Sequence, residues 1–282
     1  MRPEKNLLNI GWFSSGRGEG SRGLLSFIQA RIMDGLLNAN IQFVFSNRKR
    51  GEFSGSDTFL DLTDRLGIPL FTLSSDDYRL NYKGSRNSRR EDYDKEVLQL
   101  LSGQMPDVCV LAGYMLILSE GMCSRFPFIN LHPALPDGPI GTWQQVIWDL
   151  ISKRSEQTGS MTHLATSQVD RGPVISYCTN RIVGMPFDEA WADISGKDLE
   201  RIKDDAGEDL LLFQLIRQSG YSQEPYLIYE TLKAVSEGRI NLDNNEILNN
   251  SSNSLPLCLD EEITRSMPVS YTHLTLPTIL RV

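Results

Sequence analysis

The 282-residue sequence predicts an α/β fold, in which a Rossmann-like, mainly parallel, twisted sheet carries helices on both faces. Short apolar runs alternate with segments whose apolar residues recur at helical spacing. The run at residues 108–112 is almost wholly apolar, which is typical of a parallel strand buried on both faces. A glycine-rich segment at residues 14–23 follows the first run and precedes the first helical pattern, as in many sheets of this class.

Strands and helices are expected to alternate along the first 240 residues. Ser119 is suited to cap one helix, and Gly238 to close the last. The expected strands are residues 7–13, 41–45, 68–73, 108–112, 128–133, 160–165 and 174–182. The expected helical segments are residues 24–36, 57–66, 93–101, 119–126, 143–151, 187–219 and 225–235.

Composition and charge exclude several classes of protein. The apolar content of 40% and the charged content of 23% fit a globular protein. The net charge of −8 argues against non-specific nucleic-acid binding, which needs a basic surface. No apolar run approaches the roughly 18 residues of a membrane span, and the polar N-terminus does not resemble a secretory signal. The expected location is the cytoplasm, where the four cysteines, which form no CxxC pair, would stay reduced.

One folded domain, residues 1–240, is expected to carry every candidate site residue. From residue 241 the composition shifts toward asparagine and serine, so residues 241–267 are expected to be a disordered linker or tail. Residues 268–282 resemble one reading frame of a sequencing adapter and are expected to be non-native.

The strand expected at residues 128–133 ends in an amide and an imidazole. The period of two places Asn130 and His132 on the same face, which looks into the ligand crevice at the carboxyl end of a parallel strand. An amide beside an imidazole can stabilise an oxyanion and move a proton; a polar strand end with a capped turn is the alternative. Asp170 would orient the His132 ring if it lay beside it, and is otherwise a turn residue. His163, in mid-strand, is expected to have a structural or supporting role.

The glycine-rich segment contains the pattern GxGxxG at residues 18–23. Between a strand and a helix, its backbone amides can bind a phosphate at the helix N-terminus; a tight turn without a ligand is the alternative. Dinucleotide binding is a second interpretation, because Arg48 suits the 2′-phosphate of NADP, although the acid that would select NAD is missing. The residues expected to bind phosphate are Gly16, Arg17, Gly18, Gly20, Ser21 and Arg22.

Three further motifs stand out in the sequence: Leu111-Ala112-Gly113-Tyr114-Met115, Ile129-Asn130-Leu131-His132-Pro133 and Val169-Asp170-Arg171-Gly172-Pro173-Val174-Ile175. Together they resemble the folate-dependent formyltransferases. Their order and spacing fit that family, and the similarity runs from about residue 7 to residue 240, with an atypical stretch at 187–221. The resemblance implies the Rossmann-like formyltransferase fold and transfer of the formyl group of 10-formyltetrahydrofolate to a primary amine, without a metal.

The resemblance also implies roles for individual residues. Asn130, His132 and Asp170 would be the catalytic residues: Asn130 and His132 would stabilise a tetrahedral intermediate, and Asp170 would tune His132. The substrate phosphate would bind at the glycine-rich segment, and Glu224 would bind the substrate ribose. The folate would lie against Arg90, Met115, Leu116, Ile117, Leu118, Thr166, Ser167, Gln168 and Val169.

Departures from the family pattern bear on the amine substrate. The most similar branch formylates glycinamide ribonucleotide in purine biosynthesis. However, Arg22 stands where asparagine is common, Leu116 where arginine is common, and residues 134–141 replace a usual Ser-Leu-Leu-Pro pattern and a lysine. Another amine such as a sugar nucleotide, or an NADP-dependent oxidoreductase, is therefore an alternative. The expected partners are small molecules rather than nucleic acid or a membrane, and a homodimer is compatible with the sequence.

Overall fold

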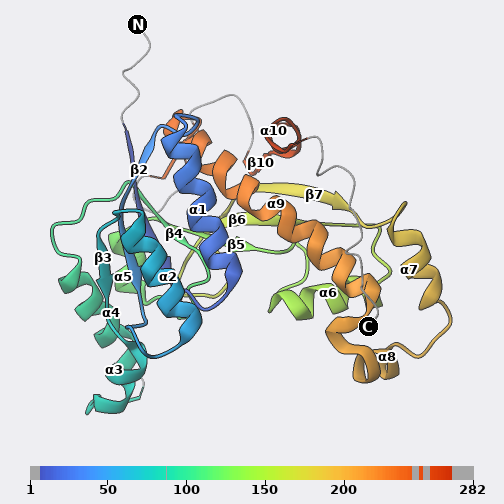
Figure 1. Ribbon diagram of the computed structural model, residues 1–282, viewed down its shortest axis with the longest axis horizontal. Coiled ribbons are helices and arrows are strands. Elements are labelled where there is room, and N and C mark those ends of the chain that lie inside the picture. Colours follow the sequence, from blue (N-terminus) through green and yellow to red (C-terminus); the bar gives the residue numbers. More distant parts are fainter. Residues whose placement is uncertain (1–6, 87, 243–247, 250–254, 269–282) are drawn as a thin grey trace, which may run out of the picture. The chain divides into compact units, whose positions relative to one another are not determined.

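The computed structural model describes residues 7–86, 88–242, 248–249 and 255–268 (Figure 1). The chain divides into two compact units, each assembled from separate parts of the sequence. The first unit comprises Met1–Leu131, Thr162–Ser176 and Thr231–Leu257, and the second comprises His132–Met161, Tyr177–Glu230 and Cys258–Val282. The expected domain boundary at residue 240 stays a prediction.

The main strands are β1 (Leu8–Ser14), β2 (Ala39–Ser46), β3 (Leu70–Thr72), β4 (Val108–Leu111), β5 (Phe128–His132), β6 (Gln157–Leu164), β7 (Val174–Arg181) and β10 (Leu257–Cys258). They form one eight-stranded sheet of order β10-β7-β6-β5-β4-β1-β2-β3. β1 runs parallel to β2 and β4, β2 to β3, and β4 to β5. A second sheet pairs β8 (Ile240–Asn241) with β9 (Leu248–Asn249). The mainly parallel sheet confirms the predicted fold class.

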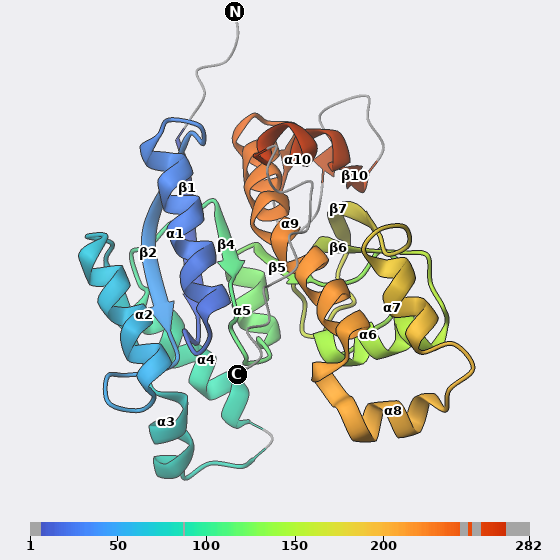
Figure 2. The ribbon, with the colours of Figure 1, turned by 45° about the vertical axis from the view of Figure 1, so that its right-hand side comes forward.

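The helices are α1 (Glu19–Met33), α2 (Ser54–Arg65), α3 (Ser75–Asn81), α4 (Arg89–Leu100), α5 (Glu120–Arg125), α6 (Trp143–Ser152), α7 (Phe187–Asp193), α8 (Leu199–Ala206), α9 (Leu211–Ser236) and α10 (Asp260–Ser266). In the first unit, α1 and α2 lie on one face of the sheet, and α4 and α5 lie on the other (Figures 1 and 2). The predicted cap of α5 is confirmed, since the Ser119 hydroxyl accepts a hydrogen bond from the Met122 backbone N–H. No helix in the described part of the chain is long and apolar enough to cross a membrane.

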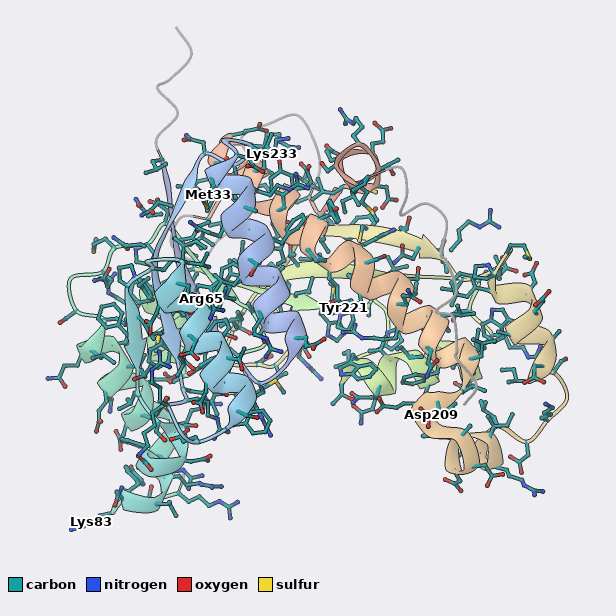
Figure 3. The ribbon with its side chains drawn as sticks, in the orientation of Figure 1. Met33, Arg65, Lys83, Asp209, Tyr221 and Lys233 are labelled. Carbon is teal, nitrogen blue, oxygen red and sulfur yellow. The ribbon has the colours of Figure 1, made fainter. Side chains whose placement is uncertain are left out.

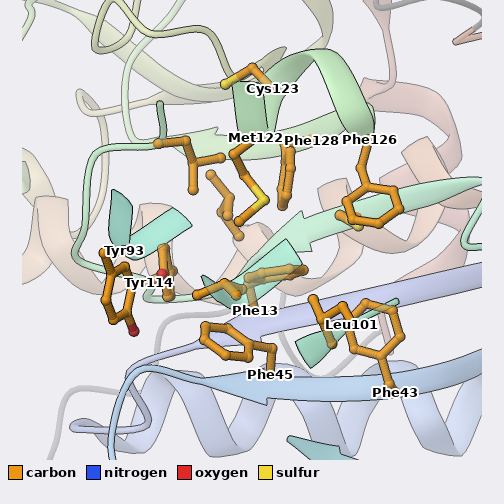
Figure 4. Packing of buried hydrophobic residues seen from close by; sticks show 14 residues of the cluster. Phe13, Phe43, Phe45, Tyr93, Leu101, Tyr114, Met122, Cys123, Phe126 and Phe128 are labelled. Atoms are coloured by element: carbon orange, nitrogen blue, oxygen red, sulfur yellow. The ribbon is translucent and has the colours of Figure 1, made fainter. Parts of the chain in front are cut away.

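The core of the first unit shows why β1 and β2 form buried strands. Phe13 of β1 and Phe43 and Phe45 of β2 are fully buried in one cluster with apolar side chains of α4 and α5 (Figure 4). Ile10 and Trp12 point to the opposite face, because strand side chains alternate, and they are also fully buried. Burial on both faces explains the continuous apolar runs that predicted these strands.

Two helical segments differ from the prediction. α9 is one helix of 26 residues, so the predicted start at Pro225 is wrong. A proline removes one helical hydrogen bond, and the buried Ile216 and Leu227 on either side of it hold the helix together. α3 was not predicted, because no side chain of this polar helix is buried. It begins at a cap that periodicity does not reveal: the Ser74 hydroxyl accepts from the Asp77 N–H at 3.0 Å.

The expectation of a disordered linker at residues 241–267 differs from the structure in its described part. α10 lies there, and Leu259 and Ile263 are buried. In the second unit, Thr179 donates from its backbone N–H and its hydroxyl to the Asp260 carboxylate at 2.7 and 2.6 Å. Most of the polar composition that suggested disorder belongs to residues 243–247 and 250–254, which lie outside the described residues. The expected adapter-derived tail also lies outside them, from residue 269 onward.

Candidate functional site

Asn130 and His132 lie two residues apart in β5, as predicted. Asn130 is the register partner of Leu111, the last residue of β4, so it lies at the carboxyl edge of the parallel sheet. His132 is buried, and its Nε2 lies 3.0 Å from the backbone oxygen of Pro139. Because a carbonyl only accepts, this ring nitrogen carries the proton in that contact.

Asp170 is brought to the end of β5 through Asn130. The Asn130 Nδ2 donates to Asp170 Oδ1 at 3.2 Å, across 40 positions of sequence. His163 of β6 joins the same cluster, with its Nε2 3.2 Å from Asn130 Nδ2 and 3.5 Å from Asp170 Oδ1. The cluster is largely closed to solvent, since the His163 side chain is 2% exposed and that of Asp170 is 15% exposed.

The backbone of the Asp170 turn is strained and closely packed. Asp170 has φ of 52°, in the left-handed region that non-glycine residues rarely occupy. Two residues later, a Cβ on Gly172 would lie 1.6 Å from the backbone oxygen of Leu164, at the end of β6. The turn therefore sits directly on the strand, and this packing holds Asp170 in its costly conformation.

Gly172→Ala is expected to destabilise the fold and to lower activity. The added methyl group forces the turn away from Leu164, and we expect a loss of about 1–3 kcal/mol in the free energy of unfolding. Urea denaturation measures this loss. Gly121→Ala is the control, because that α5 glycine has open space around its Cβ and should keep or slightly gain stability. Equal stabilities of the two variants would contradict the close packing of the turn.

The glycine-rich segment is shorter as a loop than predicted. α1 begins at Glu19, with Gly18 at its N-cap position, so Gly20, Ser21 and Arg22 lie in the first turn of the helix. The expectation of a loop up to residue 23 is therefore wrong. The first backbone amides of a helix have no hydrogen-bond partner within it and attract anions. Because residues 20–22 now supply these amides, the segment is still suited to bind a phosphate.

Both arginines of this segment lie against the start of α2. The Arg22 Nη1 donates to the backbone oxygen of Gly55 at 3.3 Å. The Arg17 guanidinium stacks on the Phe53 ring, 5.0 Å from its centroid. Gly16 has φ of 64°, and a Cβ there would meet Phe59 at 2.7 Å, so only glycine fits this turn.

The loops after β1 and β4 are tied together in the first unit. The Ser15 hydroxyl donates to Asn47 Oδ1 at 2.7 Å and accepts from the Met115 N–H at 3.1 Å. Gly113 has φ of 70°, and a Cβ there would lie 2.4 Å from Ser21 Oγ. The first turn of α1 therefore reaches the β4 loop, whose strand is the direct neighbour of β5.

The residues expected to contact folate fall into two groups. Met115, Ile117 and Val169 are exposed apolar residues of the first unit, with exposed fractions of 72%, 48% and 52%. Leu118, in contrast, is buried in the aromatic core, so core packing accounts for an apolar residue at this position without a ligand. The remaining expected residues are the half-buried Leu116 and Thr166 and the exposed Arg90, Ser167 and Gln168.

One buried tyrosine and three buried cysteines keep their protons at physiological pH. Burial raises the pKa of Tyr114 well above its ordinary value, so its hydroxyl keeps its proton. Burial also raises the pKa of Cys109, that of Cys123 to about 11 and that of Cys178 to about 12. These thiols are not reactive thiolates. Across the described ranges, no group of three or more His, Cys, Asp or Glu side chains could hold a metal ion.

Glu224 lies within α9 rather than before it, and it is paired. Arg217, seven residues earlier, donates from Nη1 to Glu224 Oε1 at 2.7 Å. The Arg217 guanidinium also lies 4.8 Å from the Trp143 ring centroid and 4.9 Å from that of Tyr221, which Figure 3 labels. Sequence reasoning missed Arg217, because a pair seven residues apart in a helix has no simple spacing signal.

A small cavity adjoins this pair in the second unit. Its volume is about 20 Å³, and Pro133, Ser160, Arg217 and Glu224 are among the residues that line it. The Ser160 hydroxyl is buried and has no hydrogen-bond partner among the described residues. The cavity has room for about one water molecule or hydroxyl group.

Arg48, which supported the NADP interpretation, is occupied by carboxylates. It forms ion pairs with Glu52, at 3.7 Å, and with Asp76. Its guanidinium charge is therefore compensated within the protein, and a cofactor phosphate is not needed to explain it.

The sequence is similar to those of known formyltransferases and deformylases. A family model described as formyl transferase matches residues 18–187. Phosphoribosylglycinamide formyltransferase of Escherichia coli is 31% identical over 173 residues, which cover 60% of this chain and 70% of that protein. Formyltetrahydrofolate deformylase of Bacillus subtilis is 28% identical over 169 residues, which cover 59% of this chain and 49% of that protein.

Solved structures show the same fold. The phosphoribosylglycinamide formyltransferase structure from Coxiella burnetii matches with a TM-score of 0.61 and 21% identity, over 87% of this chain and 94% of that chain. A formyltetrahydrofolate deformylase structure from Burkholderia mallei matches with a TM-score of 0.59 and 17% identity, over 88% of this chain and 71% of that chain. The family model covers more than half of the sequence, and so the chain belongs to the formyl transferase family.

Proposed function

We propose that this chain transfers the formyl group of 10-formyltetrahydrofolate to the primary amine of glycinamide ribonucleotide. The observation that carries the proposal is the 3.2 Å hydrogen bond from Asn130 to Asp170 at the carboxyl edge of the sheet. This hydrogen bond holds the Asn130 amide beside the Asp170 carboxylate. The imidazole of His132 follows two residues later on the strand of Asn130.

The residues suit acyl transfer through a tetrahedral intermediate. The neutral amine attacks the formyl carbon, and the carbonyl oxygen becomes an oxyanion. The Asn130 amide and the imidazolium form of His132 donate hydrogen bonds to that oxygen, and one such donor contributes roughly 3–4 kcal/mol in comparable sites. Asp170 accepts the proton of the amine through water. The bond between the formyl carbon and N10 of the folate then breaks, N10 takes up that proton, and tetrahydrofolate leaves.

Two further features support binding of the substrates. The first-turn amides of α1 suit the phosphate of the ribonucleotide. The exposed Met115, Ile117 and Val169 suit the flat faces of the folate's pteridine ring, because apolar side chains gain free energy when a stacked ring removes them from water. Both substrates are small molecules that a cytoplasmic enzyme would meet.

Hydrolysis of 10-formyltetrahydrofolate is the second candidate. Relatives named as deformylases are about as similar in sequence as relatives named as formyltransferases. Water would then replace the amine in the same attack. A sugar-nucleotide amine is a further acceptor class that the unusual residues 134–141 leave open.

One assay separates these candidates. The protein is incubated with 10-formyl-5,8-dideazafolate, and the release of dideazafolate is followed by absorbance with and without glycinamide ribonucleotide. We expect release that depends on the amine. Equal release without amine, accompanied by formate, would establish a hydrolase. No release from well-folded protein would reject glycinamide ribonucleotide as the acceptor.

Glu224→Gln is expected to raise the KM for glycinamide ribonucleotide about tenfold. The change removes the charge that strengthens hydrogen bonds to the ribose hydroxyls, and such bonds contribute about 1.5–3 kcal/mol. Steady-state kinetics should show an unchanged KM for the folate. The matched control is Glu200→Gln, an exposed glutamate of α8. An unchanged KM for the ribonucleotide in Glu224→Gln would remove Glu224 from the ribose site.

A further inference from the structure

His163 has no role in the proposed reaction as described so far, although it is buried against two of the proposed catalytic residues. Its Nδ1 lies 3.0 Å from the backbone oxygen of Leu164. Its Nε2 lies 3.2 Å from Asn130 Nδ2 and 3.5 Å from Asp170 Oδ1. All of these groups belong to the first unit.

The contacts of His163 determine where its proton lies. The Leu164 oxygen can only accept, so Nδ1 carries the hydrogen. In a neutral ring Nε2 is then an acceptor, and it takes one hydrogen of the Asn130 amide. The second hydrogen of that amide goes to Asp170 Oδ1. Both hydrogens of the Asn130 nitrogen are therefore engaged.

This arrangement fixes which way the Asn130 amide points. If the amide were turned over, its oxygen would face the Asp170 carboxylate and the unprotonated His163 nitrogen, and three acceptors would meet. Asp170 alone would still favour the observed orientation. However, only His163 gives the second hydrogen a neutral acceptor in the absence of substrate.

We propose that His163 is a positioning residue that holds one amide hydrogen of Asn130 until the oxyanion takes it. The proposal rests on the formyl transfer proposed above. A charged oxygen is a stronger acceptor than a neutral imidazole nitrogen, so the hydrogen passes from His163 Nε2 to the oxyanion as charge develops. The bond to Asp170 is kept during this exchange, and the donor needs little reorganisation. No covalent bond is formed or broken.

A histidine that only fills space predicts a different response to substitution. For that role, the shape and stability of the cluster matter, and every variant should lose activity in proportion to lost stability. For a positioning role, an acceptor at the place of Nε2 matters. Glutamine can present such an acceptor, because its side-chain end lies at about the reach of Nε2, whereas leucine cannot.

The test compares His163→Gln with His163→Leu in the full chain. We expect His163→Leu to lower kcat about tenfold, less than the loss of a whole oxyanion donor, with both KM values changed less than about twofold. We expect His163→Gln to keep kcat within about threefold. Melting temperatures of both variants are measured alongside. Equal losses of kcat in the two variants, or losses that follow stability, would overturn the proposal.

A second measurement does not need turnover. Nitrogen-15 NMR of histidine-labelled protein reports the tautomer of each ring, and the chain has three histidines, so His163 is identified by the signals lost in His163→Gln. Protonation at Nδ1 supports the proposal, and protonation at Nε2 overturns it. A wild-type chain that transfers no formyl group would overturn the proposed function, while the tautomer would still decide whether His163 can hold Asn130.

Discussion

Asp170→Asn is expected to lower the turnover of formyl transfer at least about 100-fold. The substitution keeps the shape of the side chain but removes its charge and one acceptor oxygen. An amide in this place no longer accepts the proton of the attacking amine. Its remaining oxygen can still accept from the Asn130 amide, which donates to Asp170 at 3.2 Å in the unmodified chain, but the hydrogen bond to an uncharged oxygen is weaker. The side chain is only 15% exposed, so water screens its charge weakly.

Kinetics separate this catalytic effect from a loss of binding. We expect the KM values for the folate and the amine to change little, because Asp170 acts on the reacting atoms rather than on the ends of the substrates. Asp193→Asn is the control, since that carboxylate of α7 is 72% exposed and pairs with Lys197 on the surface. Near-normal turnover of Asp170→Asn would remove Asp170 from the catalytic role.

Most of the sheet could be predicted from the sequence, because its strands are buried on both faces. Burial of successive side chains on opposite faces, such as Trp12 and Phe13, produces apolar runs that stand out in the sequence. The cap of α5 was also predictable, since the Ser119 hydroxyl bonds to a nearby backbone N–H. Such signals are local, and so they remain visible in one sequence.

Elements held by tertiary packing were not predictable in the same way. α9 continues through Pro225 because buried residues on both sides compensate for a lost hydrogen bond. α10 forms in a segment that composition assigned to a linker, because Asp260 accepts two hydrogen bonds from Thr179 and Ile263 is buried. These partners lie far away in the sequence, so neither propensity nor composition reveals them.

The same distinction applies to the candidate site. The motif around Asn130 is contiguous, so the family resemblance identified it at once. Because strand ends of a parallel sheet share one edge, Asp170 was expected at this edge, beside His132. The structure joins Asp170 to Asn130 there, which the sequence did not predict. The pair of Arg217 with Glu224 and the contact of His163 with Asn130 depend on side-chain directions, which the sequence does not encode locally.

Phe13→Ala is expected to lower the free energy of unfolding by about 3–5 kcal/mol, the usual cost of removing a buried phenylalanine. The Phe13 ring is fully buried, with its centroid 4.9 Å from that of Phe128, 5.2 Å from that of Phe45 and 5.8 Å from that of Tyr114 (Figure 4). The neighbouring rings come from strands β2 and β5 and from the loop after β4. If one of them moved into the space left by Phe13, it would lose its contacts with the others, so the cavity stays largely unfilled. A loss of this size is a large part of the total stability of an ordinary domain.

Urea denaturation followed by tryptophan fluorescence measures the loss. Leu80→Ala is the control, because Leu80 is 77% exposed on α3 and its truncation should change the unfolding free energy by less than about 0.5 kcal/mol. Phe13→Ala with wild-type stability would contradict the aromatic core. Because the Phe13 ring packs on Phe128, which begins the strand of Asn130, the cavity loosens that strand without removing a catalytic group. At temperatures where Phe13→Ala is still folded, its turnover should therefore fall less than that of Asp170→Asn.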